Sequence, residues 1–182
     1  LIANGFFTIM DFGTSQIENG MYFNGFSDLS IPYDSVLNPD SFTIMCWAKV
    51  FGNDGSFRAP VYFRTTSQES LRTGYNFYCE NDNVWSFWMG TGNTWQQFDT
   101  GVSCSASDTY FFLAATYDAS SSSVNVFVDG VLAVSGTALN FIHFIPTPDE
   151  EVDFSIGSAK NGNYYFNGLI SEVALLDYAA DA

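Results

Sequence analysis

The segment Val124-Asn-Val-Phe-Val-Asp129-Gly130-Val-Leu-Ala-Val134 carries the clearest structural signal in this chain. Val124, Val126 and Val128 recur with a period of two, which places every second side chain on one face of a β-strand. Asp129-Gly130 supplies the positive φ angles that a type I′ turn requires. The segment therefore predicts two antiparallel strands joined by a tight hairpin.

Short apolar segments fill the rest of the chain, separated by Gly, Asn, Asp, Ser and Pro. No segment sustains the 3.6-residue period of an amphipathic helix, and one short helical turn is expected near Tyr33–Leu37. The predicted strands span about 6–10, 20–24, 28–32, 41–50, 58–65, 74–80, 84–90, 94–99, 109–118, 123–129, 131–137, 152–157 and 163–177. This succession is typical of a single all-β sandwich or barrel domain, residues 1–182.

Composition narrows the class of partner. The chain has 20 acidic and 5 basic residues, a formal net charge of −15. Nucleic acids and anionic membranes bind through clustered Lys and Arg, so neither is expected as a partner. The acidic surface favours solubility, with cation binding as the alternative. No segment has the length of a membrane span or the pattern of a signal peptide, and the start at Leu1 suggests a domain of a larger protein.

The three cysteines, Cys46, Cys79 and Cys104, allow at most one disulfide bond. No CxxC spacing points to a zinc site. Cys46 lies within a predicted strand and is expected to be a small buried residue. Cys79 and Cys104 either pair or are both free.

Three blocks of sequence carry a family resemblance. They are Met21–Gly25 with Leu29–Pro32 and Ser41–Val50; Phe112–Asp118 with its hairpin; and Phe154–Gly157 with Tyr165–Val173. In order and spacing they resemble the laminin G-like branch of the concanavalin A-like lectin and glucanase superfamily. The resemblance implies an antiparallel jelly-roll β-sandwich with two curved sheets.

The sequence argues against catalysis. Related glucanases place two glutamates around an aspartate on one strand, because retaining hydrolysis needs a nucleophile and an acid/base about 5 Å apart. Glu151-Val-Asp153 begins like that motif, but Ile156 stands where the acid/base belongs. Glu151 and Asp153 are therefore interpreted as exposed residues of a half-exposed strand. The lone histidine, His143, lies in an apolar segment and is interpreted as structural.

Aromatic and amide side chains are the candidates for ligand binding, because planar rings stack on pyranoses and amides bond hydroxyls. The main group is Trp85, Trp88 and Trp95 with Asn93 and Gln97. Trp85 and Trp88 would face opposite ways, so at least one tryptophan is also expected in the core. A second group, Tyr164 and Tyr165, has turn formation as its alternative explanation.

The resemblance also implies a calcium site near the first strands and in the last strand. Asp28 matches the family's aspartate after the F-x-G turn. The last-strand aspartate is replaced by Ser171, and Glu172 beside it points to the other face. Calcium needs about 6–8 oxygen ligands. A site at Asp28 and Glu172 and a metal-free domain both remain open.

These observations predict a noncatalytic recognition module that binds carbohydrate or protein ligands on an extracellular, cell-surface or virion protein. The alternative is a purely structural domain whose sandwich forms an oligomer or particle interface. An active β-glucan hydrolase is the third reading, and it lacks an acid/base pair. Ligand identity and oligomeric state are not indicated by the sequence.

Overall fold

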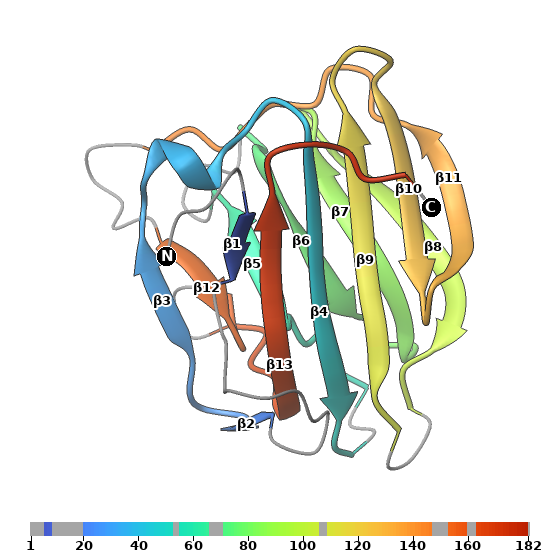
Figure 1. Cartoon of the computed structure of the whole chain (residues 1–182). Helices are drawn as coiled ribbons and strands as arrows, with labels where there is room; N and C mark the ends of the chain where they lie inside the picture. Colours follow the sequence, from blue (N-terminus) through green and yellow to red (C-terminus); the bar gives the residue numbers. More distant parts are fainter. Residues whose placement is uncertain are drawn as a thin grey trace.

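The computed structural model describes residues 6–8, 20–52, 55–65, 71–105, 109–146, 153–159 and 163–181. They form a two-layer antiparallel β-sandwich (Figure 1). The strands are β1 (Phe6–Thr8), β2 (Met21–Asn24), β3 (Leu29–Pro32), β4 (Phe42–Val50), β5 (Val61–Arg64), β6 (Gly74–Cys79), β7 (Val84–Gly90), β8 (Trp95–Ser103), β9 (Phe111–Asp118), β10 (Ser123–Val128), β11 (Val131–Thr137), β12 (Asp153–Ile156) and β13 (Asn167–Leu176).

Two sheets face each other. The front sheet in Figure 1 has the order β1-β13-β4-β9-β10-β11, with β2 also paired to β13. The back sheet has the order β3-β12-β5-β6-β7-β8. The predicted all-β class and the predicted sandwich are confirmed.

Aromatic side chains from both sheets fill the space between the layers. Phe42 of β4 stacks on Tyr75 of β6 at 4.5 Å, and Tyr75 meets Phe63 of β5 edge-on at 5.7 Å. All three rings are essentially inaccessible to solvent. Burying rings of this size is the main stabilising contribution to such a core.

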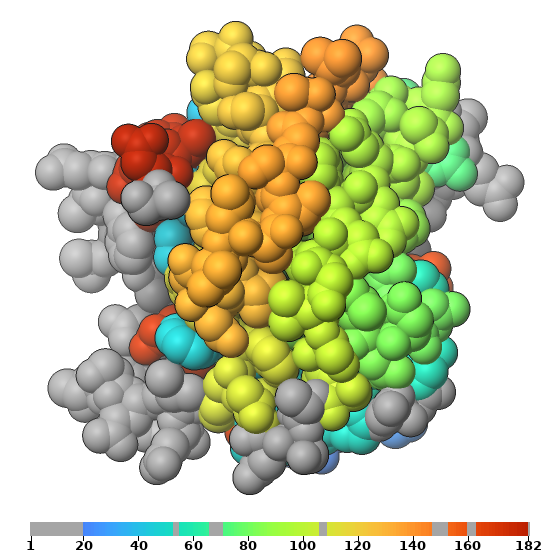
Figure 2. Space-filling view, turned by 90° about the vertical axis from the view of Figure 1, so that its right-hand side faces the viewer, coloured from blue at the N-terminus to red at the C-terminus, as the bar shows by residue number. Residues whose placement is uncertain are grey.

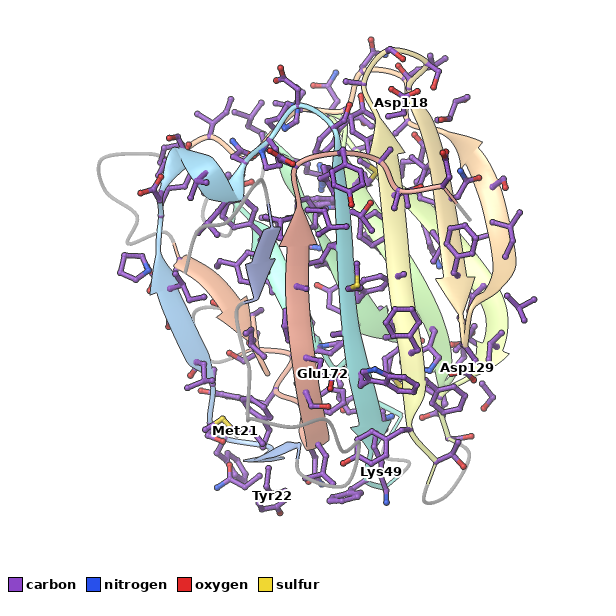
Figure 3. All side chains as sticks on the ribbon, viewed as in Figure 1. Met21, Tyr22, Lys49, Asp118, Asp129 and Glu172 are labelled. Carbon is purple, nitrogen blue, oxygen red and sulfur yellow. A yellow bond between two sulfur atoms is a disulfide. The ribbon has the colours of Figure 1, made fainter. Side chains whose placement is uncertain are left out.

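The predicted hairpin is present. Asp129 and Gly130 have φ angles of 53° and 75°, and Val124, Val126 and Val128 are all buried. Asp129 Oδ1 accepts a hydrogen bond of 2.8 Å from the backbone N–H of Phe112, which ties the turn to β9. Figure 3 shows Asp129 at one end of β10 and Asp118, the last residue of β9, at the other.

The two sheets close against each other along one side, where β8 and β11 lie side by side (Figure 2). Gln96 Nε2 donates to the carbonyl of Thr137 at 2.6 Å. The ring of Phe98 lies against Gly136, where an added Cβ would come within 2.9 Å of it. The outward face of β8 therefore continues the outward face of the back sheet up to this closed edge.

Most predicted strands agree with the structure, and the differences are local. β8 runs on to Ser103, and β13 begins at Asn167 rather than near residue 163. A 3-10 helix, η2 (Ser35–Leu37), occupies the predicted helical turn. The prediction that β12 is half exposed is wrong, because Ser155 on its second face is also fully buried and Asp153 is only partly exposed. Glu151, which was also expected to be exposed, lies outside the described residues.

The structure shows which cysteines are paired. Cys79 and Cys104 form a disulfide bond, and Cys46 is free and buried in the core. Burial raises the pKa of the Cys46 thiol to about 12. His143 is half-buried and packs against Phe141 at 4.7 Å. Among the described residues, no helix combines the length and the hydrophobicity of a membrane-spanning segment.

Candidate functional site

The three predicted tryptophans lie on two different faces of the back sheet. Trp85 is 0% exposed, and its ring meets Phe111 of the front sheet at 5.9 Å. Trp88 and Trp95 are partly exposed on the outward face. The prediction of Trp85 as a ligand residue is therefore corrected, because the two-residue period of β7 turns Trp85 into the core. The expectation that at least one tryptophan belongs to the core is confirmed.

A row of side chains crosses the outward face of the back sheet. Strand register pairs each member with the next, from β12 through β5, β6 and β7 to β8. This cross-strand row consists of Ser155, Tyr62, Asn76, Trp88 and Gln97. It brings the predicted residues Trp88 and Gln97 into direct register, since neighbouring residues on one face of a sheet have Cβ atoms about 5 Å apart.

Arg64 lies beside this row at the end of β5. It is paired with Gly74 of β6, while Trp95 of β8 is paired with Gly90 of β7. A side chain at either glycine would clash with backbone, that of Phe63 at Gly74 and that of Arg72 at Gly90. The Arg64 guanidinium carbon lies 4.0 Å from the Trp95 ring centroid.

The described neighbours of the Arg64 guanidinium are aromatic rings and an amide. The ring centroids of Tyr62 and Tyr78 lie 5.1 Å and 5.7 Å from the guanidinium carbon. Arg64 Nη1 donates a hydrogen bond of 3.2 Å to Asn76 Oδ1. Stacking on aromatic rings stabilises a cation by about 0.5–2 kcal/mol but leaves its N–H groups free for an anion. Among the described residues, Arg64 has no carboxylate partner.

Glu80 fixes two of the candidate ligand residues. It is 9% exposed, and its Oε1 accepts from Trp88 Nε1 at 2.9 Å and from Gln97 Nε2 at 2.8 Å. Trp88 Nε1 also lies 2.9 Å from Ser86 Oγ. A carboxylate that accepts two bonds holds the indole and the amide in fixed orientations before a ligand arrives.

Three buried polar atoms on this face have no hydrogen-bond partner. They are Arg64 Nε, Asn76 Nδ2 and Ser155 Oγ. An unsatisfied buried donor costs about 1–3 kcal/mol, so such groups are uncommon in folded proteins. Asn76 and Ser155 are both 0% exposed. The three atoms lie close together, where Arg64 meets the cross-strand row. We call the cross-strand row, together with Arg64, Trp95 and Glu80, the outer face.

The remaining predicted ligand residues lie at the edges of the outer face. Asn93 is exposed in the turn before Trp95, where its carbonyl accepts from Arg72 Nη1 at 2.8 Å. Tyr164 and Tyr165 lie with Phe57 on a groove of about 520 Å³ at the end of the sandwich. The Phe57 ring links that groove to Trp88, at 6.3 Å.

The predicted calcium ligands do not form a carboxylate cage. Asp28 is exposed in the turn between β2 and β3, and Glu172 is exposed on the outward face of β13 (Figure 3). Glu172 sits at an irregularity in β13 with φ of 51°. Within the described residues, no three His, Cys, Asp or Glu side chains gather as a metal site would require. A calcium site at Asp28 and Glu172 stays a prediction of the family resemblance.

Sequence reasoning missed Arg64, Asn76, Glu80, Tyr62 and Tyr78. Their positions alternate with the core residues of β5 and β6, which was a usable signal for an outward face. Arg64 is also one of only five basic residues in the chain. Burial on the outer face raises the pKa of Tyr78, so its hydroxyl stays protonated at neutral pH.

Comparisons with known proteins agree with this architecture. A family model described as the concanavalin A-like lectin/glucanases superfamily matches residues 23–182. The Ruminococcus gnavus IT-sialidase CBM40 bound to α2,3-sialyllactose superposes with a TM-score of 0.69 at 14% identity, covering 89% of this chain and 91% of that chain. A comparison with curated protein sequences found no match.

Two further solved structures share the fold. The leech intramolecular trans-sialidase complexed with 2,7-anhydro-Neu5Ac has a TM-score of 0.67 at 16% identity, covering 90% of this chain and 26% of that chain. A putative carbohydrate binding protein from Bacteroides ovatus has a TM-score of 0.63 at 18% identity, covering 88% of this chain and 45% of that chain. The family match, together with the two-sheet topology, confirms the resemblance found in the sequence: the chain belongs to the concanavalin A-like lectin/glucanases superfamily, as a laminin G-like domain.

Proposed function

We propose that this domain is a noncatalytic recognition module that binds glycans on the outer face of its back sheet. The ligand class is a glycan that carries a carboxylate. Trp95 and Trp88 supply ring surface for the sugar, Gln97 supplies an amide for its hydroxyls, and Arg64 binds the acid group. This division of roles follows the general chemistry of sugar sites, in which rings give area and a few polar groups give orientation.

The observation that carries the proposal is that Arg64 stacks on an aromatic ring and has no carboxylate partner among the described residues. In a chain of net charge −15, a cation on a sheet face would ordinarily pair with one of the many carboxylates. Arg64 is instead held by Trp95 and Asn76, with no carboxylate partner among the described residues. A planar guanidinium presented in this way matches the two oxygens of a carboxylate.

The solved structures with this fold support a glycan ligand. Two of them were determined with α2,3- and α2,6-sialyllactose, both of which carry a carboxylate. Against the NanB sialidase from Streptococcus pneumoniae, this chain covers only 26% of that chain. A binding role without catalysis is consistent with a likeness that extends over only part of such enzymes.

We also propose an extracellular or cell-surface setting. Stable disulfide bonds form in oxidising compartments, and the Cys79–Cys104 bond joins the end of β6 to the segment after β8. Calcium stays a prediction of the family resemblance, and the proposed mode of binding does not need it.

A glycan array tests the proposal. We expect the domain to bind glycans with a carboxylate more strongly than their neutral counterparts. Trp95→Ala should weaken binding at least tenfold, because loss of the ring removes both the sugar platform and the support of Arg64. A domain that binds no glycan on the array, or that binds equally after Trp95→Ala, contradicts the proposal.

A further inference from the structure

We propose that the groove at the end of the sandwich is a second sugar subsite, for an uncharged pyranose joined to the acidic sugar on the outer face. The inference rests on the proposed function for the class of ligand, but the groove's own chemistry carries it. Ten described residues line the groove, and its volume is about 520 Å³. The lining residues that matter are Asn24, Phe26, Asn81, Tyr164, Tyr165 and Asn167.

The groove is neutral in an acidic molecule. The chain has 20 acidic residues, yet none of the ten described lining residues is charged. Sites for anions or cations place a complementary charge within reach, and the described lining of this groove offers none. An uncharged ligand that can both stack and form hydrogen bonds fits the lining best.

The amides of the groove are available to a ligand. Asn24 and Asn167 are paired across β2 and β13, so their side chains lie close together. Asn24 uses only Oδ1, which accepts from the Phe26 N–H at 2.9 Å. The side chains of Asn81 and Asn167 make no hydrogen bond with any described residue. Each amide offers donors and acceptors, the combination that sugar hydroxyls require.

The aromatic residues of the groove are exposed or strained. Phe26 is 83% exposed, which is unusual for a ring of this size, and lies 6.2 Å from Tyr165. Tyr164 is 41% exposed and has φ of 54°, a left-handed backbone that costs a bulky residue about 1–3 kcal/mol. Ala59 N–H donates to the Tyr164 carbonyl at 2.9 Å and helps hold this conformation. Strain that presents a ring to solvent is typical of binding sites.

The groove is continuous with the outer face. Phe57 lines the groove, and its ring lies 6.0 Å from the Tyr164 ring and 6.3 Å from the Trp88 ring. Phe57 and Trp88 are both partly exposed, and Trp88 is in register with Gln97 on the outer face. The groove and the outer face therefore meet at Phe57 and Trp88, so one oligosaccharide can extend from one to the other.

The experiment uses α2,3-sialyllactose, which joins an acidic sugar to two neutral ones, and the methyl glycoside of sialic acid, which lacks the neutral sugars. Phe26→Ala and Asn81→Ala should each weaken binding of α2,3-sialyllactose at least about threefold and leave binding of the methyl glycoside unchanged. Tyr178→Ala is the matched control, since Tyr178 is an exposed aromatic residue outside the groove. Lactose alone should shift the NMR signals of the Asn81 and Asn167 side-chain amides.

The outcomes separate the two proposals. If α2,3-sialyllactose binds but neither groove variant changes its affinity and lactose shifts neither amide, the second subsite is refuted while the proposed function stands. If no acidic glycan binds but lactose shifts the groove amides, the groove is a neutral-sugar site and the proposed role of Arg64 fails.

Discussion

Glu80 and Trp88 are joined by a hydrogen bond of 2.9 Å from the indole Nε1 to the carboxylate Oε1. The same oxygen accepts from Gln97, so one buried carboxylate orients the ring and the amide of the outer face together. Preorganisation of this kind lowers the entropic cost of binding a ligand. It also makes Glu80 a structural residue of the site.

Removing Glu80 should reduce stability as well as binding. We expect Glu80→Ala to lower the free energy of unfolding by about 1–3 kcal/mol, because it leaves the Trp88 and Gln97 donors unsatisfied. Glu80→Gln keeps one acceptor and should cost less. Urea unfolding measures both variants. Equal stability of wild type and Glu80→Ala would contradict the role of this carboxylate.

Substitutions of Trp85 and Trp95 should have opposite effects: the first should reduce stability and the second should reduce glycan binding. Trp85→Ala removes a fully buried ring and is expected to cost about 3–5 kcal/mol of stability without touching the outer face. Trp95→Ala should change stability by about 1 kcal/mol or less while abolishing most glycan binding. Thermal unfolding paired with a binding assay makes the comparison. A stable Trp85→Ala protein would mean that the ring is not part of the core.

The disulfide bond should stabilise the domain. A bond that closes a loop with a sequence separation of 25 contributes about 3 kcal/mol in the chain-entropy account. Reduction should therefore lower the unfolding temperature, and thiol titration of the native protein should detect no reactive cysteine. Burial raises the pKa of the remaining thiol, Cys46, to about 12, which keeps it inert until the protein unfolds. Detection of three reactive thiols in the native, unreduced protein would refute the pairing.

His143 should make the free energy of unfolding depend on pH in the mildly acidic range. Desolvation by burial lowers its pKa from 6.5, while the charge of Asp40 opposes the shift. The unfolded state then binds a proton more readily than the folded state, so stability is lost as pH falls below about 6.5 and through the lowered folded pKa. His143→Gln should flatten the dependence of stability on pH in this range. An unchanged slope would show that another group is responsible.

The fold could be predicted from the sequence, but only some of the residues of the outer face could. Alternation in Val124–Val128 and the glycine after Asp129 predicted the hairpin, because those signals are local. Opposite faces for Trp85 and Trp88 were predictable for the same reason. Which of the two faces was the core could not be predicted, since that depends on packing between strands far apart in the chain.

Arg64 shows what local signals lack. Its place in the site comes from its contact with the Trp95 ring, at 4.0 Å. Arg64 lies on β5 and Trp95 on β8, three strands away in the back sheet, and only the strand order brings them together. The pairing of Cys79 with Cys104 was likewise left open, because spacing alone does not determine connectivity.

The most direct test is calorimetric titration of α2,3-sialyllactose into the wild type, Arg64→Gln and Lys49→Gln. Lys49 lies on the front sheet, so its variant removes the same charge away from the proposed site. We expect Arg64→Gln to weaken binding about 10- to 100-fold, as for loss of a charged hydrogen-bonding partner, and Lys49→Gln to bind like the wild type. Equal affinities for all three proteins would contradict recognition of an acidic glycan by Arg64.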